Sequence, residues 1–149
     1  MEYSLDDLSP IDPIEHIRRN PDMYLGTSID TPAVLIANAM ALEAKTLGAS
    51  RVEIVDADGW KIVRADLDWL NVECSHHVTV EQVFWNICAF PEAGVNSMRA
   101  EVLATAFSDA VVTYSQESRY LVKGCQCIPS TVWSWLEANA WIRVVAFQL

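Results

Sequence analysis

The sequence has little glycine, little basic charge and no long apolar run. Only five glycines and six prolines occur among 149 residues, and no repeat, low-complexity segment or linker divides the chain. A chain of this length is typical of one domain, so we expect a single domain over residues 1–149. The longest nearly apolar run, residues 31–42, is well short of the roughly 20 residues that a membrane span requires. We therefore expect no membrane partner.

Basic residues are outnumbered two to one by acidic residues. Ten Lys and Arg face twenty Asp and Glu, which gives a formal net charge of −10. Such a chain lacks the cations that replace condensed counterions on phosphate, so we expect no nucleic-acid partner. It is equally unsuited to an anionic membrane surface. The charge instead suits a basic protein partner, which electrostatic steering would attract.

No targeting signal is visible at the N-terminus. The segment MEYSLDDLSP has neither a basic stretch nor an apolar stretch, so it is unlike a signal peptide, and we expect a cytoplasmic location. The four cysteines are then expected to be free thiols.

The cysteines leave two interpretations open. Cys125 and Cys127, with Cys74, His76 and His77, supply the residue types of a zinc site. Structural zinc sites, however, usually have about two to four residues between paired cysteines, and here there is one. Packing as small hydrophobic residues is therefore the favoured interpretation, and we expect no metal.

Local patterns predict an α+β fold. Asp12-Pro13 and Thr31-Pro32 are typical of a helix cap followed by the first helical residue, and residues 57–59 (ADG) are typical of a hairpin turn. Helices are predicted over residues 14–20, 33–48, 80–90, 96–107 and 131–139. Strands are predicted over residues 51–55, 60–66, 109–114, 119–125 and 141–149. This order favours a layer of helices on one face of a mostly antiparallel sheet.

Acidic residues concentrate in the N-terminal fifth of the chain. The first thirty residues hold seven acids and two bases, and residues 1–11 are predicted to form an acidic N-terminal arm. One interpretation is a solvated segment, and the other is a docking surface for a partner. The acidic face of the second interpretation comprises Asp6, Asp7, Asp12, Glu15, Asp22 and Asp30.

Three of the six tryptophans lie near the C-terminus: Trp133, Trp135 and Trp141. They either fill the core at the end of the sheet or form an exposed aromatic patch, since tryptophan is enriched at interface hot spots. Residues two apart cannot share one face of a helix, so one of Trp133 and Trp135 is expected to be exposed.

One stretch resembles a known family. IEHIRRNPDMYLG, residues 14–26, is similar to the opening of the ATPase domain shared by DNA gyrase B and its topoisomerase IV counterpart, with Arg18, Pro21, Met23 and Tyr24 in matching places. Weaker similarity extends over residues 12–123. The resemblance implies the GHKL fold, a two-layer sandwich with helices on a mixed sheet. The motif from Arg18 to Gly26 can persist without catalysis if Met23 and Tyr24 pack the N-terminal arm onto the sheet, which is what we expect.

The resemblance does not extend to the ATPase chemistry. The family's long helix supplies a Glu that activates water and an Asn that binds magnesium, and Leu35 and Ala39 stand at those positions. The turn whose Asp holds the adenine matches residues 66–70 (DLDWL), which have an Asp at 66 or 68 but no glycine. The glycine-rich lid matches residues 93–102, where only Gly94 remains. We therefore expect no nucleotide cofactor and no catalytic residue.

These features together predict a non-catalytic protein-binding module on a degenerate gyrase B-like ATPase scaffold. A small acidic chain suits an immunity or inhibitor protein that neutralises a basic partner, such as a nuclease toxin. A regulator that binds gyrase or another GHKL protein is a variant of this class. The alternative is a diverged nucleotide-binding GHKL ATPase related to gyrase B. The sequence leaves the oligomeric state open.

Overall fold

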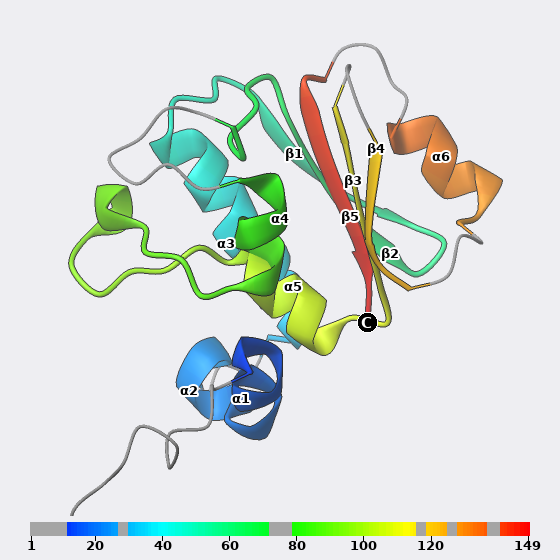
Figure 1. Cartoon of the computed structure of the whole chain (residues 1–149). Coiled ribbons are helices and arrows are strands. Elements are labelled where there is room, and N and C mark those ends of the chain that lie inside the picture. Colours follow the sequence, from blue (N-terminus) through cyan, green and yellow to red (C-terminus); the bar gives the residue numbers. More distant parts are fainter. Residues whose placement is uncertain (1–11, 27–29, 72–78, 116–118, 125–127, 137–140) are drawn as a thin grey trace, which may run out of the picture.

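The computed structural model describes residues 12–26, 30–71, 79–115, 119–124, 128–136 and 141–149. These residues form six α-helices, a short 3-10 turn at Pro91–Ala93 and one five-stranded sheet (Figure 1). The helices are α1 (Pro13–Arg19), α2 (Pro21–Leu25), α3 (Pro32–Thr46), α4 (Val80–Trp85), α5 (Glu101–Phe107) and α6 (Ser130–Leu136). The strands are β1 (Val52–Ala57), β2 (Trp60–Ala65), β3 (Ala110–Ser115), β4 (Arg119–Lys123) and β5 (Arg143–Gln148).

The sheet consists of two hairpins joined by the last strand. The strand order is β1-β2-β5-β3-β4, so β5 lies between the hairpins β1–β2 and β3–β4. All four pairings are antiparallel. The α+β class is confirmed, but the mixed sheet implied by the resemblance is wrong for the described strands. The reason is that β5 runs opposite to both of its neighbours, β2 and β3.

The turn between β1 and β2 follows directly from its two central residues. Asp58 and Gly59 both have positive φ angles, 53° and 83°. This is the type I′ geometry that an Asp-Gly pair favours, because it matches the twist of the flanking strands. Ala57 and Trp60 pair across the turn, and the predicted hairpin is confirmed.

The helix starts agree with the predicted caps. The Asp12 carboxylate accepts a hydrogen bond from the Ile14 N–H at 3.1 Å, and the Thr31 hydroxyl accepts one from the Val34 N–H at 3.4 Å. In both helices the next residue is proline, which loses nothing by lacking an N–H in the first turn.

Three helix boundaries differ from the predictions. Pro21 does end the first helix, but it also opens α2, because proline is well suited to the first helical position. The helix predicted over 80–90 ends at Trp85. The helix predicted over 96–107 begins only at Glu101, since the preceding segment contains the 3-10 turn and a positive φ of 68° at Asn96.

Each face of the sheet carries its own core. The face covered by α3, α4 and α5 holds the larger core, in which Met40, Trp69 and Phe84 are fully buried (Figure 1). On the opposite face, Val132 of α6 packs in a second core with Trp60, Ile62 and Trp141 of the described chain. The predicted helix layer is therefore present, and the short helix α6 adds cover to the face that was expected to be bare.

The N-terminal helices join the helix layer. Helix α1 packs against α5, where the guanidinium of Arg18 donates to the carbonyl oxygen of Ala106, and α2 contacts α1 and α3. Tyr24 is half-buried against the larger core and its hydroxyl lies 2.7 Å from Nδ1 of His16, whereas Met23 is 72% exposed. Met23 is therefore not the packing residue that was expected, and the N-terminal arm, residues 1–11, lies outside the described residues.

Gly124 provides a test of the packing at the end of β4. Gly124 has a φ of +99°, and a Cβ atom there would lie 2.7 Å from the Cβ of Ala110. Gly48 has a comparable φ of +115° with open space around it. We expect Gly48→Ala to lower the free energy of unfolding by about 1–3 kcal/mol through backbone strain alone. Gly124→Ala should cost about 1–3 kcal/mol more through overpacking.

Urea unfolding followed by tryptophan fluorescence measures both losses. Equal losses for the two variants would contradict the close contact between Gly124 and Ala110.

Candidate functional site

The interior between α3 and the segment before α5 is where the resemblance would place a nucleotide. Leu35 and Ala39 of α3 occupy the positions of the base and the metal ligand, and neither side chain has a polar atom. Ala39 lines a cavity of about 220 Å³ whose other walls include Glu43, Phe90 and Met98. Pockets that hold ligands usually measure about 300–1,000 Å³, so this cavity is small for a nucleotide.

Both aspartates at the matched adenine position have partners within the protein. Oδ1 of Asp66 accepts hydrogen bonds from the backbone N–H groups of Ser50 and Arg51 at 3.0 and 3.1 Å. Asp68 forms a bidentate pair with Arg143, with N···O distances of 2.8 and 2.9 Å. Each carboxylate therefore holds two parts of this fold together. These contacts occupy the oxygens that an adenine would need.

Trp69 fills the turn where the family has glycine. Its side chain is fully buried, and its indole N–H donates to Oε1 of Glu101 at 2.8 Å. Its carbonyl oxygen accepts a hydrogen bond from Nη2 of Arg99 at 2.9 Å. A fixed aromatic side chain at this place prevents the close backbone approach that glycine permits.

Three charged residues lie together beside Trp69, and we call them the buried charged cluster: Glu43, Arg99 and Glu101. Nε of Arg99 lies 3.5 Å from Oε2 of Glu43, and Nη2 lies 3.5 Å from Oε1 of Glu101. Oε1 of Glu43 also accepts a hydrogen bond from the N–H of Ala100. The cluster thereby links α3, α5 and the turn that precedes α5.

Burial raises the pKa of Glu43 well above its ordinary value. The negative charge of Glu101 and a hydrogen bond between the two carboxyl groups raise this pKa further, while Arg99 and the Ala100 N–H partly oppose the shift. A single proton shared between Glu43 and Glu101 leaves one negative charge, which balances the positive charge of the Arg99 guanidinium. The buried charged cluster is then neutral overall, which minimises the free-energy cost of burying it.

Sequence reasoning did not find this cluster. None of Glu43, Arg99 and Glu101 is among the predicted site residues. The available signal was that Glu43 is the first charged residue in a largely apolar helix, and Glu101 precedes another apolar run. Charges inside apolar helices are usually paired when buried, but their partners cannot be identified from one sequence.

The predicted acidic face is only partly described. Asp6 and Asp7 lie outside the described residues. Asp12 caps α1, and Glu15 forms an ion pair with Arg19 one turn along the same helix. Surface pairs of this kind contribute little to stability, but they dilute the local negative charge.

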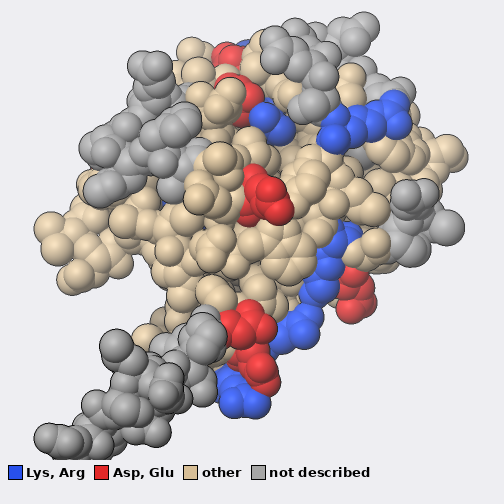
Figure 2. Space-filling model, viewed as in Figure 1, with Lys and Arg blue, Asp and Glu red and all other residues tan. Residues whose placement is uncertain are grey.

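The other members of the predicted acidic face are exposed. Asp22 lies in the first turn of α2, and Asp30 immediately precedes the cap of α3. Figure 2 shows acidic and basic side chains next to one another at the end of the molecule where α1 and α2 lie. In the described chain this region is therefore a mixed surface.

The three C-terminal tryptophans do not form one patch. Trp133 is half-buried with Arg119 4.4 Å above its ring, and Trp135 is 37% exposed. Arg64 lies between Trp135 and Trp141, at 4.8 and 4.6 Å from the two ring centres. Trp141 is buried in the second core, so including it in an exposed patch is wrong. The expectation that one of Trp133 and Trp135 is exposed is confirmed for Trp135.

Metal and thiol chemistry find little support in the described chain. Among its residues no group of three or more His, Cys, Asp and Glu is arranged to hold a metal ion. Burial raises the pKa of Cys88, which is the opposite of what a nucleophilic thiolate requires. The residues of the zinc alternative lie outside the described part: Cys74, His76, His77, Cys125 and Cys127.

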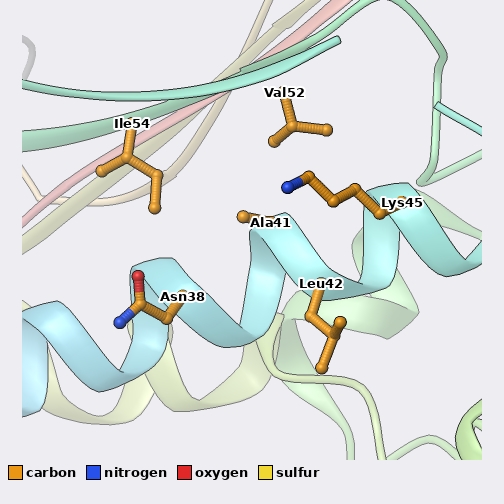
Figure 3. A pocket seen from close by; sticks show the side chains of 6 residues that line it. All are labelled: Asn38, Ala41, Leu42, Lys45, Val52 and Ile54. Atoms are coloured by element: carbon orange, nitrogen blue, oxygen red, sulfur yellow. The ribbon is translucent and has the colours of Figure 1, made fainter. Parts of the chain in front are cut away.

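A second hollow lies on the surface between α3 and β1, and we call it the β1 groove. It has a volume of about 330 Å³ and is lined by Asn38, Ala41, Leu42, Lys45, Val52 and Ile54 (Figure 3). Leu42 is 63% exposed and Ile54 is 38% exposed. No predicted site residue lies in this groove.

No protein-family model matches the chain, and no curated protein matches it. Within the described residues, no helix has both the length and the apolar character needed to cross a membrane.

The buried charged cluster makes a prediction about pH. Because the pKa of Glu43 is raised, the folded protein keeps a proton that the unfolded chain releases above about pH 4.5. The stability of the wild-type protein should therefore fall as the pH rises from this value to the raised pKa. Glu43→Gln keeps an oxygen for the Ala100 N–H and removes this fall. The free energy of unfolding of Glu43→Gln, relative to that of wild type, should increase by about 1.4 kcal/mol for each pH unit between the ordinary and the raised pKa of Glu43.

Urea unfolding at intervals from pH 4 to pH 8 measures this difference. Glu81→Gln, an exposed carboxylate of α4, is the matched control and should follow the wild-type curve. If the free energy of unfolding of Glu43→Gln changes with pH just as that of wild type does, Glu43 does not hold a proton in the folded protein.

Proposed function

We propose that this chain is a non-catalytic protein-binding module on a degenerate gyrase B-like ATPase scaffold. In this proposal it acts as an acidic immunity or inhibitor protein that binds and neutralises a basic partner, such as a nuclease toxin. The observation that carries the proposal is the filled interior at the position of a nucleotide. Trp69 is fully buried there, and Asp68 is paired with Arg143.

The side chains at that position offer no route to phosphoryl chemistry. A water molecule needs a base to activate it, and magnesium needs oxygen ligands, but Leu35 and Ala39 supply neither. Glu43, the nearest carboxylate along α3, is committed to Ala100 and Arg99. These contacts favour the protein-binding module, in which the scaffold is retained for its shape, rather than the diverged ATPase.

The charge of the chain supports a basic partner. A net charge of −10 on 149 residues creates a field that attracts a cationic surface and speeds association. Enzymes that act on nucleic acids present such surfaces, because they bind phosphates. An acidic protein that covers this kind of surface blocks the substrate and is held by complementary charge.

The first test addresses the nucleotide. Titration of the protein with magnesium-ATP in a calorimeter should give no binding heat at millimolar nucleotide, because the hollow beside Ala39 is small, at about 220 Å³, and Leu35 and Ala39 supply neither a base nor a metal ligand. A gyrase B ATPase domain, titrated in the same buffer, provides the positive control. Binding in the micromolar range would contradict the proposal and support the diverged ATPase.

The second test addresses the partner. The immobilised protein should capture a basic protein from its host at low salt and lose it at high salt, because exposed charges are screened. Mass spectrometry identifies the captured protein. Capture of an acidic protein, or capture that does not weaken with salt, would contradict electrostatic docking.

The exposed acids Asp12, Asp22 and Asp30 should act mainly on the rate of association. Replacing Asp12, Asp22 and Asp30 by Asn should slow binding of the captured partner at least threefold with little change in dissociation, as expected for charges that steer. The control removes three charges elsewhere: Glu81→Gln, Glu92→Gln and Asp109→Asn. Surface plasmon resonance measures both rates. If the two triple variants slow association equally, the N-terminal acids do not belong to the docking surface.

A further inference from the structure

Strand β1 is an open edge of the sheet. It pairs with β2 alone, and no described residue forms a ladder with its outer side. The outer N–H and C=O groups of an edge strand can pair with an extended segment of another protein, which adds a strand to the sheet.

The β1 groove gives this edge a lateral binding surface. Val52 and Ile54 point from β1 toward α3, and Ala41 faces them from the helix, whereas Leu42 leaves the helix on the side away from the strands (Figure 3). Lys45 extends along the groove beside Val52. An added strand would place every second side chain above this groove, where it would cover the exposed part of Ile54.

The charges along β1 are acidic. Its six residues, VEIVDA, include Glu53 and Asp56 and no Lys or Arg. The side chains of Asp56 and Glu53 are 73% and 47% exposed, although Lys61 and Arg64 of β2 each contact one carboxylate oxygen, at 2.6 and 2.8 Å. Because side chains alternate along a strand, Asp56 follows Val52 and Ile54 on the α3 side, and Glu53 lies on the other side.

A second copy of this chain is a poor occupant of the edge. Two β1 strands would place acids against acids. The other edge, β4, carries two cations, but Nζ of Lys123 is turned to the carbonyl oxygens of Thr105 and Ser108, at 2.9 and 2.7 Å, which leaves one cation to meet the two acids of β1. Arg119 lies over the Trp133 ring. Charge complementarity therefore favours a different protein with a basic strand.

We infer that β1 and the β1 groove receive an extended segment of a basic protein partner, which pairs with β1 as a sixth strand. This inference rests on the proposed function and locates its docking site. The segment carries apolar side chains above Val52 and Ile54, and Lys or Arg near Asp56 and Glu53. Lys45 marks the end of the groove where a basic residue is disfavoured.

The first experiment uses the captured partner and two single variants. Ile54→Lys and Asp56→Lys should each weaken its binding at least tenfold, mainly by faster dissociation, because they disrupt the docked strand rather than the long-range field. Val95→Lys is the control, since Val95 is 92% exposed and lies before α5, away from β1. Circular dichroism and urea unfolding establish that the three variants fold equally.

The second experiment needs no natural partner. An eight-residue capped peptide of alternating lysine and valine is titrated into the ¹⁵N-labelled full chain. Amide shifts and slowed hydrogen exchange should concentrate at residues 52–57 and in α3. The same peptide with glutamate in place of lysine should bind at least tenfold more weakly.

The outcomes separate this inference from the proposed function. A basic partner that binds Ile54→Lys and Asp56→Lys as well as Val95→Lys would overturn the β1 site and leave the proposed function standing. Peptide shifts confined to α1 and α2, or no binding at millimolar peptide, would also overturn it. Protection of β1 that rises with protein concentration in the absence of peptide would identify a second copy as the occupant. Failure to capture any basic partner, with β1 still binding the peptide, would count against the proposed function alone.

Discussion

The interior of this protein is organised by the need to compensate buried charge. Glu43 and Glu101 are almost inaccessible to solvent, and Arg99 lies against both of them. A buried carboxylate without a partner would be strongly destabilising, so these contacts constrain how α3, α5 and the intervening turn pack. The same constraint draws in Trp69, whose indole hydrogen-bonds to Glu101. The turn that contains Trp69 is thus tied to the helix layer through Glu101 and Arg99.

Local signals were enough to predict most elements but not their environment. Asp12-Pro13, Thr31-Pro32 and Asp58-Gly59 act within a few residues, and the caps and the turn formed where they were expected. The antiparallel direction of β5, the face covered by α6 and the burial of Trp141 depend on contacts between distant segments. The late start of α5 has a similar origin, because Arg99 and Ala100 are held by Trp69 and Glu43 in a non-helical turn.

The candidate sites likewise combine features that the sequence reveals with contacts that only the folded chain reveals. That Leu35 and Ala39 lack polar atoms is evident from the sequence, whereas the pairing of Asp68 with Arg143 joins residues 75 positions apart. The openness of β1 follows from the insertion of β5 between β2 and β3, which leaves β1 and β4 as the edges. Composition predicts that the chain is acidic, but only the topology places Glu53 and Asp56 on an edge strand. Hence the acids first assigned to docking and those on the open edge lie on different elements.

The central place of β5 has a consequence for how the sheet is held together. In the described chain β5 pairs with β2 on one side and with β3 on the other, so it makes the ladders that join one hairpin to the other. Without β5, the N–H and C=O groups along the inner edges of β2 and β3 would be unpaired and open to strands of other chains. Loss of this single strand would therefore divide the sheet into two separate two-stranded ribbons, each of which is marginally stable on its own.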